Sequence, residues 1–214
     1  MHKLTLLSLF SLSVLSGCAT TIDLTPKERQ EVHTIAIDPK VSVTDQMSFY
    51  GDGMQIFAGF GLAGMMVEAS IANQDSKKII AEQEQNHVSP DQDLVQIMTQ
   101  ALNATSSFKV VNTEPDAVMT LAVTGYGLMA QKMGFSLSKL GPMITISAKL
   151  TRDHQIIWQH REIVPEWACT TPGYSMDELH AHPEYLKEMW DAVTLVAVKK
   201  LVQDLVNPAQ TSNQ

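Results

Sequence analysis

Two histidines and a glutamate lie close together late in the chain, in the sequence HAHPE. His180 and His182 are two residues apart, and Glu184 follows two residues later. Zinc needs three or four converging ligands, usually from an i, i+4 histidine pair or from a second cluster. A spacing of two suits an extended backbone, whereas this stretch is a proline-rich approach to a helix. We therefore predict a solvated loop and no metal here, with a metal-dependent hydrolase using His180 and His182 as the alternative.

Serine chemistry has two weak candidates. Ser136 and Lys139 have the Ser-x-x-Lys spacing of penicillin-recognising enzymes, but the companion elements Ser-x-Asn and Lys-Thr-Gly are absent from the sequence. The sequence GYSMD lacks the second glycine of a nucleophile elbow, and Ser175 followed by Glu178 indicates a helix capping box instead. We expect no catalytic residues, no cofactor and no enzyme.

The sequence LSGC ends at Cys18, after Lys3 and an apolar run over residues 4–15. This order of charge, apolar run and small residues is typical of a secretory signal, and it is shorter than the roughly 20 apolar residues of a spanning helix. LSGC resembles the lipobox of bacterial lipoproteins. The resemblance implies a signal peptide over residues 1–17 and a mature chain whose Cys18 carries a diacylglycerol anchor and further acyl chains such as palmitate.

The residue after Cys18 and the charge of the chain bear on location and partners. Ala19, and not aspartate, follows the cysteine, which by the same resemblance implies the outer membrane with the protein facing the periplasm. The formal net charge is −8 and no block of lysine or arginine is present, so nucleic acid is not expected as a partner. The other cysteine, Cys169, is expected to be buried or to pair between chains.

The periodicity of apolar residues predicts an α/β fold, with a single mixed sheet of about five strands and two helices packed on one face. The expected strands and hairpin cover residues 32–37, 108–112, 116–128 and 143–164, and the expected helices cover 89–105 and 184–205. We predict a polar tether over 18–31, a periplasmic domain over 32–206 with an apolar, glycine-rich insertion over 54–72, and a disordered tail over 207–214.

Two segments carry apolar side chains where a surface is expected. The insertion 54–72 is either a flap packed over the sheet or an element that contacts the membrane or another copy. The stretch Met129–Pro142 holds glycines and a proline and is predicted to be a long hairpin connection. The possible contact surface consists of Phe57, Phe60, Met65, Met66, Met129, Met133 and Phe135. Alternatively, both segments fold back onto the domain.

The lipobox, DAVMTLAVTGYG and ITISAKLTRDHQIIWQH together resemble bacterial envelope lipoproteins of the class of the curli secretion lipoprotein and the activators of penicillin-binding proteins. Auxiliary lipoproteins of ABC transport systems are similar in the same features. The resemblance implies a scaffold, a secretion pore or a regulator of envelope enzymes, without catalytic residues. Because residues 54–72 are continuously apolar and do not alternate, they do not suit a pore-forming hairpin.

These features predict a non-catalytic, lipid-anchored accessory protein of the outer membrane, which acts by protein–protein contact in envelope assembly or secretion. The expected partners are the membrane, through the N-terminal acyl chains, other envelope proteins, and possible further copies in a homo-oligomer. The alternative is an auxiliary subunit of an envelope lipid-transport system, with an acyl chain held in an apolar groove.

Overall fold

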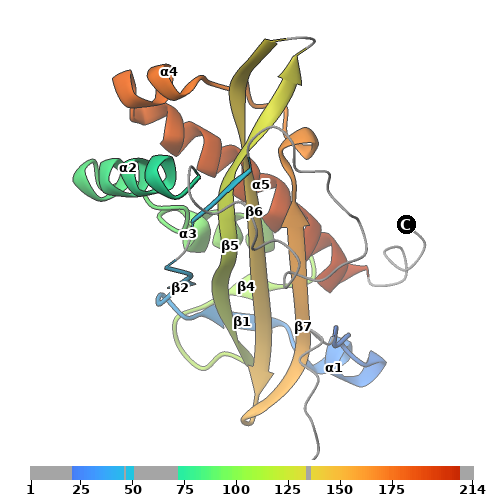
Figure 1. Cartoon of the computed structure of the whole chain (residues 1–214). Coiled ribbons are helices and arrows are strands. Elements are labelled where there is room, and N and C mark those ends of the chain that lie inside the picture. The colour runs from blue at the N-terminus through green and yellow to red at the C-terminus, as the bar shows by residue number, and fades with distance from the viewer. Residues whose placement is uncertain (1–20, 46, 51–71, 134–135, 208–214) are drawn as a thin grey trace, which may run out of the picture.

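A single mixed sheet organises the part of the chain that the computed structural model describes, residues 21–45, 47–50, 72–133 and 136–207. The strands are β1 (Thr34–Ile37), β2 (Ser42–Val43), β3 (Met47–Tyr50), β4 (Lys109–Val110), β5 (Ala117–Met133), β6 (Ser136–Arg152) and β7 (Gln155–Val164). Their order is β4-β1-β5-β6-β7, and β2 and β3 follow β1 along the same edge of β5 (Figure 1). The pairs on this side are parallel, whereas β5, β6 and β7 are antiparallel neighbours. The predicted α/β fold with one mixed sheet is confirmed.

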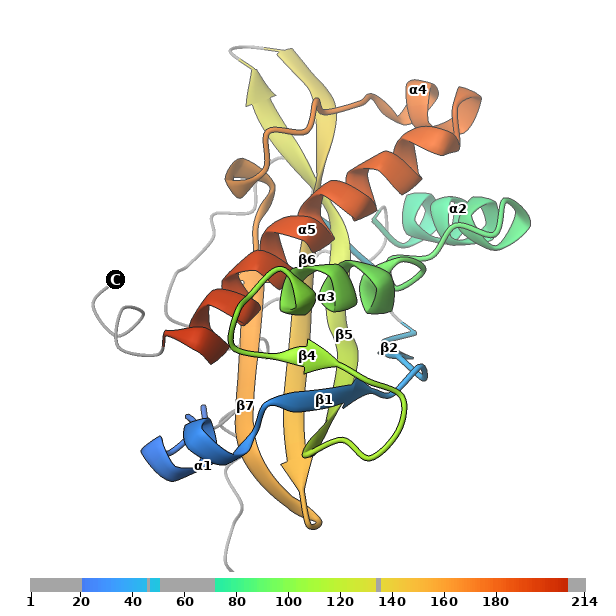
Figure 2. The ribbon, with the colours of Figure 1, turned by 180° about the vertical axis from the view of Figure 1, so that it is seen from behind.

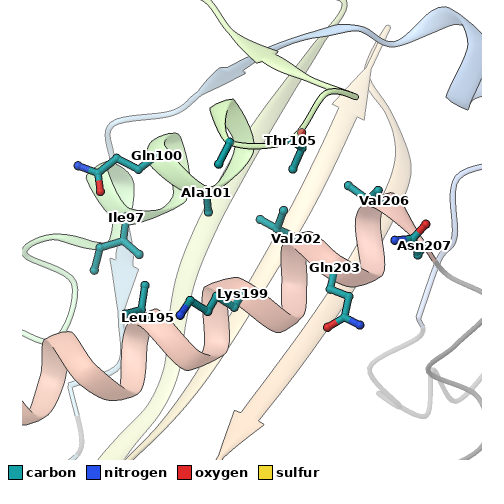
Figure 3. Close-up of a pocket in the computed structure, with 11 residues that line it drawn as sticks. Ile97, Gln100, Ala101, Thr105, Leu195, Lys199, Val202, Gln203, Val206 and Asn207 are labelled. Carbon is teal, nitrogen blue, oxygen red and sulfur yellow. The ribbon is translucent and has the colours of Figure 1, made fainter.

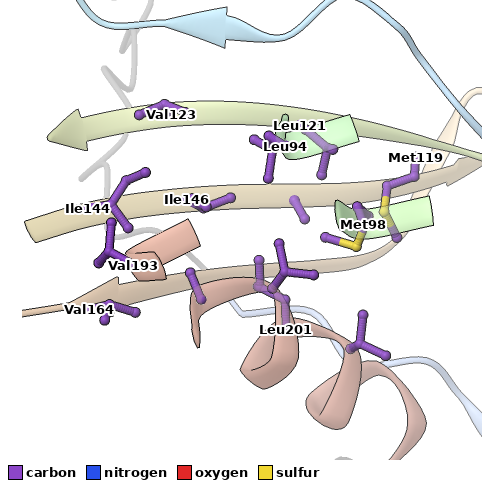
Figure 4. Close-up of a cluster of buried hydrophobic side chains, with 14 of the residues drawn as sticks. Leu94, Met98, Met119, Leu121, Val123, Ile144, Ile146, Val164, Val193 and Leu201 are labelled. Carbon is purple, nitrogen blue, oxygen red and sulfur yellow. The ribbon is translucent and has the colours of Figure 1, made fainter. Parts of the chain in front are cut away.

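Helices α3 (Leu94–Asn103) and α5 (Glu184–Val206) cover one face of the sheet (Figure 2). They confirm the two helices that the apolar periodicity predicted. Along β6, alternate residues from Ile144 to Leu150 are fully buried, and this is the face that α5 contacts. Figure 4 shows side chains from the three long strands meeting those of both helices. The core therefore forms between the apolar face of the strands, whose side chains repeat every two residues, and the apolar faces of the helices, whose side chains repeat every 3.6 residues.

The described residues form three further α-helices: α1 (Pro26–Glu31), α2 (Ala72–Gln85) and α4 (Met176–Ala181). The capping box predicted at the start of α4 is confirmed, since the Ser175 hydroxyl accepts the Glu178 N–H at 3.2 Å and the Glu178 carboxylate accepts the Ser175 N–H at 2.7 Å. A short 3₁₀ turn, η2 (Glu166–Ala168), follows β7.

The predicted connection over Met129–Pro142 is instead continuous strand, apart from residues 134 and 135, which lie outside the described residues. Gly127, just before this stretch, and Pro142 within it both suit strands for specific reasons. A Cβ at Gly127 would lie 2.0 Å from the Ser48 carbonyl oxygen, so this glycine allows β3 to approach β5. Pro142 lies beyond the last β6–β7 pair, Ile144 with Val164, where β6 is an edge strand and the missing N–H is tolerated.

The expected tether also differs from the structure over its described part. Ile22 forms an isolated bridge with Gln159 of β7, with both backbone hydrogen bonds at 2.9 Å. Leu24 is 4% exposed, and the Arg29 guanidinium donates to the Leu205 carbonyl oxygen at 2.8 Å, at the C-terminus of α5. The chain is thus bound to the domain from residue 22, because apolar Ile22 and Leu24 interrupt the polar sequence.

The expected signal peptide over 1–17, the lipidation site Cys18, residues 54–71 of the expected insertion 54–72 and residues 208–214 of the expected tail 207–214 lie outside the described residues. Within the described ranges, no helix combines the length and the apolar character that crossing a membrane requires.

Candidate functional site

The far end of the β5–β6 hairpin extends beyond the rest of the sheet (Figure 1). The pairing of β3 with β5 ends at Met129, and that of β7 with β6 ends at Ile144. Past these points the described strands pair with each other, and Leu140 also bridges Tyr174 through hydrogen bonds of 2.7 and 3.1 Å. We call β5 residues 129–133 with β6 residues 136–143 the hairpin end.

The structure places two of the predicted contact residues in the hairpin end. Met129, which pairs with Gly141, is half-buried, and Met133 pairs with Ser136. The other five, Phe57, Phe60, Met65, Met66 and Phe135, lie outside the described residues. Two of the predicted contact residues therefore lie on paired strands and not on the loop that the sequence indicated.

The hairpin end lies far along the sheet from the point where the N-terminal segment joins it. Ile22 bridges Gln159, which pairs with Lys149 on β6, and Lys149 pairs with Thr120 on β5. From Thr120 to Met133, at about 3.3 Å per residue, β5 extends roughly 40 Å. The N-terminal attachment and the hairpin end are thus well separated along the long axis of the sheet.

An apolar groove lies between α3 and α5, with a volume of about 500 Å³ (Figure 3). Its lining residues are Ile97, Gln100, Ala101, Ala104, Thr105, Leu195, Lys199, Val202, Gln203, Val206 and Asn207. Leu195 is 42% exposed in this groove, and Lys199 is the one charged residue of the lining. Such a surface can hold an aliphatic chain, but the described lining offers no pair of acid and base for catalysis.

A histidine between two aspartates joins three parts of the fold. His160 on β7 lies with Nδ1 2.7 Å from Asp204 on α5 and with Nε2 2.9 Å from Asp23 in the N-terminal segment. Asp204 is 1% exposed, and the indole ring of Trp158 stacks on the imidazole with centroids 5.0 Å apart. Because each ring nitrogen faces a carboxylate, the imidazole holds the N-terminal segment and α5 against the sheet.

In the described part of the chain, Asp23, His160 and Asp204 also form a candidate metal site. Each offers one ligand atom, and these atoms lie within 4.8 Å of one another. A metal at either ring nitrogen would have to replace one of the two carboxylate contacts. The sequence did not reveal this cluster, because its members are far apart in the chain and no short-range spacing connects them.

The histidines of HAHPE have separate neighbours. His180 Nδ1 contacts the Glu82 carboxylate of α2. His182 Nδ1 lies 3.1 Å from Glu184, and its ring is tilted by 30° against that of Tyr185, with centroids 4.9 Å apart. The two imidazoles thus bind to different elements.

The two serine candidates and Cys169 also have defined places. Ser136 and Lys139 lie on strand β6, not on the helix that the Ser-x-x-Lys chemistry needs. Cys169 follows η2, is partly buried against the core, and has its pKa raised by that burial, which disfavours the reactive thiolate.

Asp116 connects the beginning of β5 to β1. Its Oδ2 accepts the His33 N–H at 2.9 Å, the Thr34 N–H at 2.8 Å and the Thr34 hydroxyl at 2.8 Å. The two backbone hydrogen bonds, and then the hydroxyl, hold the pKa of the Asp116 carboxyl below its ordinary value.

We expect Asp116→Ala to lower the free energy of unfolding by about 1–2 kcal/mol at pH 7, since three hydrogen bonds to a charged acceptor are lost. The pKa of Asp116 is lower in the folded than in the unfolded protein, so this stabilisation is full above the unfolded value near 4 and is lost as the pH falls through the folded value. Urea unfolding from pH 7 down to pH 3 should show the difference narrowing. A difference that is independent of pH contradicts a role for the charge, and Asp116→Asn, which keeps an acceptor oxygen, is the control.

Comparisons with known proteins give structural similarity only. No family model matches the chain, and no curated protein matches its sequence. Among solved structures, protein XCC0632 from Xanthomonas campestris, assigned to DUF330, is 14% identical, with 86% of this chain and 89% of that chain covered and a TM-score of 0.40.

Two further structures are similar at a lower TM-score. For the PelC dodecamer from Paraburkholderia phytofirmans the identity is 9%, the coverage 84% of this chain and 92% of that chain, and the TM-score 0.31. A minor lipoprotein from Acinetobacter baumannii is 15% identical, with 54% of this chain and 80% of that chain covered and a TM-score of 0.31. At these TM-scores the similarities carry no argument about function.

Proposed function

We propose that this protein is a non-catalytic lipoprotein, anchored in the outer membrane and facing the periplasm, that acts by protein–protein contact through the hairpin end. The observation that carries the proposal is the separation of the two ends of the sheet. The N-terminal segment joins the sheet at Ile22, and the hairpin end lies roughly 40 Å further along β5.

The anchor follows from the lipobox. Cys18 is four residues before Ile22, so acyl chains on Cys18 hold that end of the sheet close to the membrane. Each buried methylene contributes about 0.8 kcal/mol, and chains on one residue together give stable anchoring. The hairpin end then points away from the membrane surface, toward other proteins of the envelope.

The hairpin end suits contact with a protein by addition of a strand. Past Met129 and Ile144, the described strands have outer edges with few partners, and an edge of this kind pairs readily with another chain. Met129 supplies an adaptable apolar side chain in the same place, and Met133 lies on the same strand. The partner is either a second copy of this chain or another envelope protein in assembly or secretion.

Cross-linking in intact cells tests the contact. With a photoreactive amino acid at Lys139 in the hairpin end, we expect a discrete adduct whose mass identifies a second copy or another protein. The control position is Lys109, which is exposed on β4 outside the hairpin end. The absence of an adduct from Lys139, or equal adducts from Lys139 and Lys109, contradicts the proposed contact.

The groove between α3 and α5 favours a second function, that of an auxiliary subunit in envelope lipid transport. Its aliphatic lining suits an acyl chain. We expect native mass spectrometry to detect a co-purified phospholipid if this function holds. Ala101→Trp, which fills the groove, should then abolish that lipid, whereas retention of the lipid in the variant contradicts binding in the groove.

A further inference from the structure

The surroundings of His160 bring together the side-chain types that bind a transition metal. One ring nitrogen of His160 and one carboxylate oxygen each of Asp23 and Asp204 lie within 4.8 Å of one another. The ligands of a tetrahedral zinc ion lie about 2.0–2.1 Å from the metal and therefore roughly 3.3 Å from each other. Side-chain shifts of about an ångström would allow all three atoms to bind one ion, with water in the fourth position.

The two carboxylate contacts of His160 conflict with each other when the ring is neutral. Nδ1 lies 2.7 Å from Asp204 and Nε2 lies 2.9 Å from Asp23. A neutral imidazole has one N–H, so the nitrogen without the proton presents its lone pair to a carboxylate oxygen. A metal ion at that nitrogen accepts a lone pair from the ring and another from the carboxylate, and the unfavourable contact becomes shared ligation.

The burial of the three side chains leaves one side of the group open. The side chain of Asp204 is 2% exposed and that of His160 is 13% exposed, whereas that of Asp23 is 55% exposed. An ion can therefore enter past Asp23, and water can complete the coordination on that side. The indole of Trp158, stacked on the imidazole at 5.0 Å, holds the plane of the ring. With a neutral imidazole, the three groups carry two negative charges, which a divalent ion balances.

Glu162 is a neighbouring carboxylate that lies outside this group. It is two residues after His160 on β7, so the two side chains are on the same face of the sheet. Its carboxylate lies 3.9 Å from Nζ of Lys200 on α5. Glu162 therefore provides a matched control for the effect of nearby negative charge without direct ligation.

We propose that Asp23, His160 and Asp204 bind one divalent transition-metal ion, for which Zn²⁺ is the probe. One imidazole and two carboxylates suit Zn²⁺, whereas Mg²⁺ and Ca²⁺ prefer oxygen ligands alone. The three ligands come from the N-terminal segment, β7 and α5, so the ion fastens the N-terminal segment to the domain. The proposal is independent of the lipid anchor and of the hairpin end.

Isothermal titration calorimetry with ZnCl₂ tests the site on the whole protein in mild detergent, purified without a histidine tag. We expect one zinc ion to bind with a Kd of about 10 µM or below, and at least about tenfold more tightly than Mg²⁺. Hydrogen exchange locates the ion. Zinc should slow the exchange of the Ile22 and Gln159 amides at least about threefold, because their mutual hydrogen bonds of 2.9 Å hold the segment on β7.

Asp23→Asn separates ligation from folding, because this exposed side chain contributes little to stability. We expect zinc to bind this variant at least about tenfold more weakly and to lose its effect on hydrogen exchange. Two controls should bind zinc within about threefold of the original protein. Glu162→Gln removes the neighbouring carboxylate, and His180→Ala with His182→Ala removes both histidines of HAHPE.

Four results would overturn the proposal. Zinc does not bind the original protein, or it binds Asp23→Asn as tightly as the original. Zinc leaves the exchange of the Ile22 and Gln159 amides unchanged. Finally, the variant without His180 and His182 loses zinc binding, which would place the ion at HAHPE.

Discussion

Replacing Gly127 with alanine should displace β3 from β5 and lower the free energy of unfolding by about 2–4 kcal/mol. A Cβ at this position would lie 2.0 Å from the Ser48 carbonyl oxygen and 2.8 Å from the Ser48 carbonyl carbon. Both atoms belong to the backbone of β3, so no side-chain rotation can relieve the overlap. The paired strands must separate, and the β3 contacts with α2 weaken with them.

Gly125→Ala is the matched control, two residues earlier on the same strand. Its Cβ would lie 3.5 Å from the Thr145 hydroxyl oxygen, an ordinary contact, so we expect a change below about 1 kcal/mol. Urea denaturation of the two variants measures the difference. Equal stability of the two alanine variants would show that β3 does not approach β5 as closely as the structure has it.

Replacing His160 with alanine should lower the free energy of unfolding by about 2–4 kcal/mol. The change removes the partner 2.7 Å from Asp204, whose carboxylate is buried, and a buried carboxylate that loses a polar partner is costly because its lost hydration is no longer compensated. It also removes the ring that stacks on Trp158. Thermal and urea denaturation at neutral pH measure the loss.

Asp23→Asn provides the control for His160→Ala. The side chain of Asp23 is 55% exposed, and a pair of this kind contributes about 0–1 kcal/mol, less at high salt. Asp23→Asn thus alters only the exposed contact of His160, whereas His160→Ala also removes the contact with buried Asp204, at a much larger expected cost. A loss for Asp23→Asn as large as that for His160→Ala would contradict the assignment of the main stabilisation to the buried side.

The sequence predicted the elements whose apolar pattern extends over many residues. On β6, alternate residues from Ile144 to Leu150 are buried, and α5 repeats its buried residues over six turns, so local pattern and tertiary packing agree there. The strand around Ala117–Met133 was predicted only as far as residue 128, because Gly127 and the following glycines indicated a turn. In the structure Gly127 allows a close approach between strands, which depends on Ser48, a residue distant in the sequence.

Helix α2 was not predicted, since its sequence ANQDSKKIIAEQEQ is mostly polar and shows little apolar periodicity. Clusters of residues that are distant in the sequence and meet only in the folded protein could not be predicted from local sequence patterns either. Asp23, His160 and Asp204 come from three separate elements. Met129 and Met133 were predicted to be contact residues from their apolar character, and this stays a prediction, whereas their strand conformation was not predicted.

The most direct test of the lipid-anchored function is the intact mass of the protein extracted from the cell envelope in mild detergent, beside a Cys18→Ser variant. The proposed function predicts a mature chain that begins at Cys18 and is heavier by a diacylglycerol and an amide-linked acyl chain, and a Cys18→Ser variant that carries no lipid. A full-length or cleaved chain without lipid at Cys18 would contradict the anchor, and with it the orientation that directs the hairpin end away from the membrane.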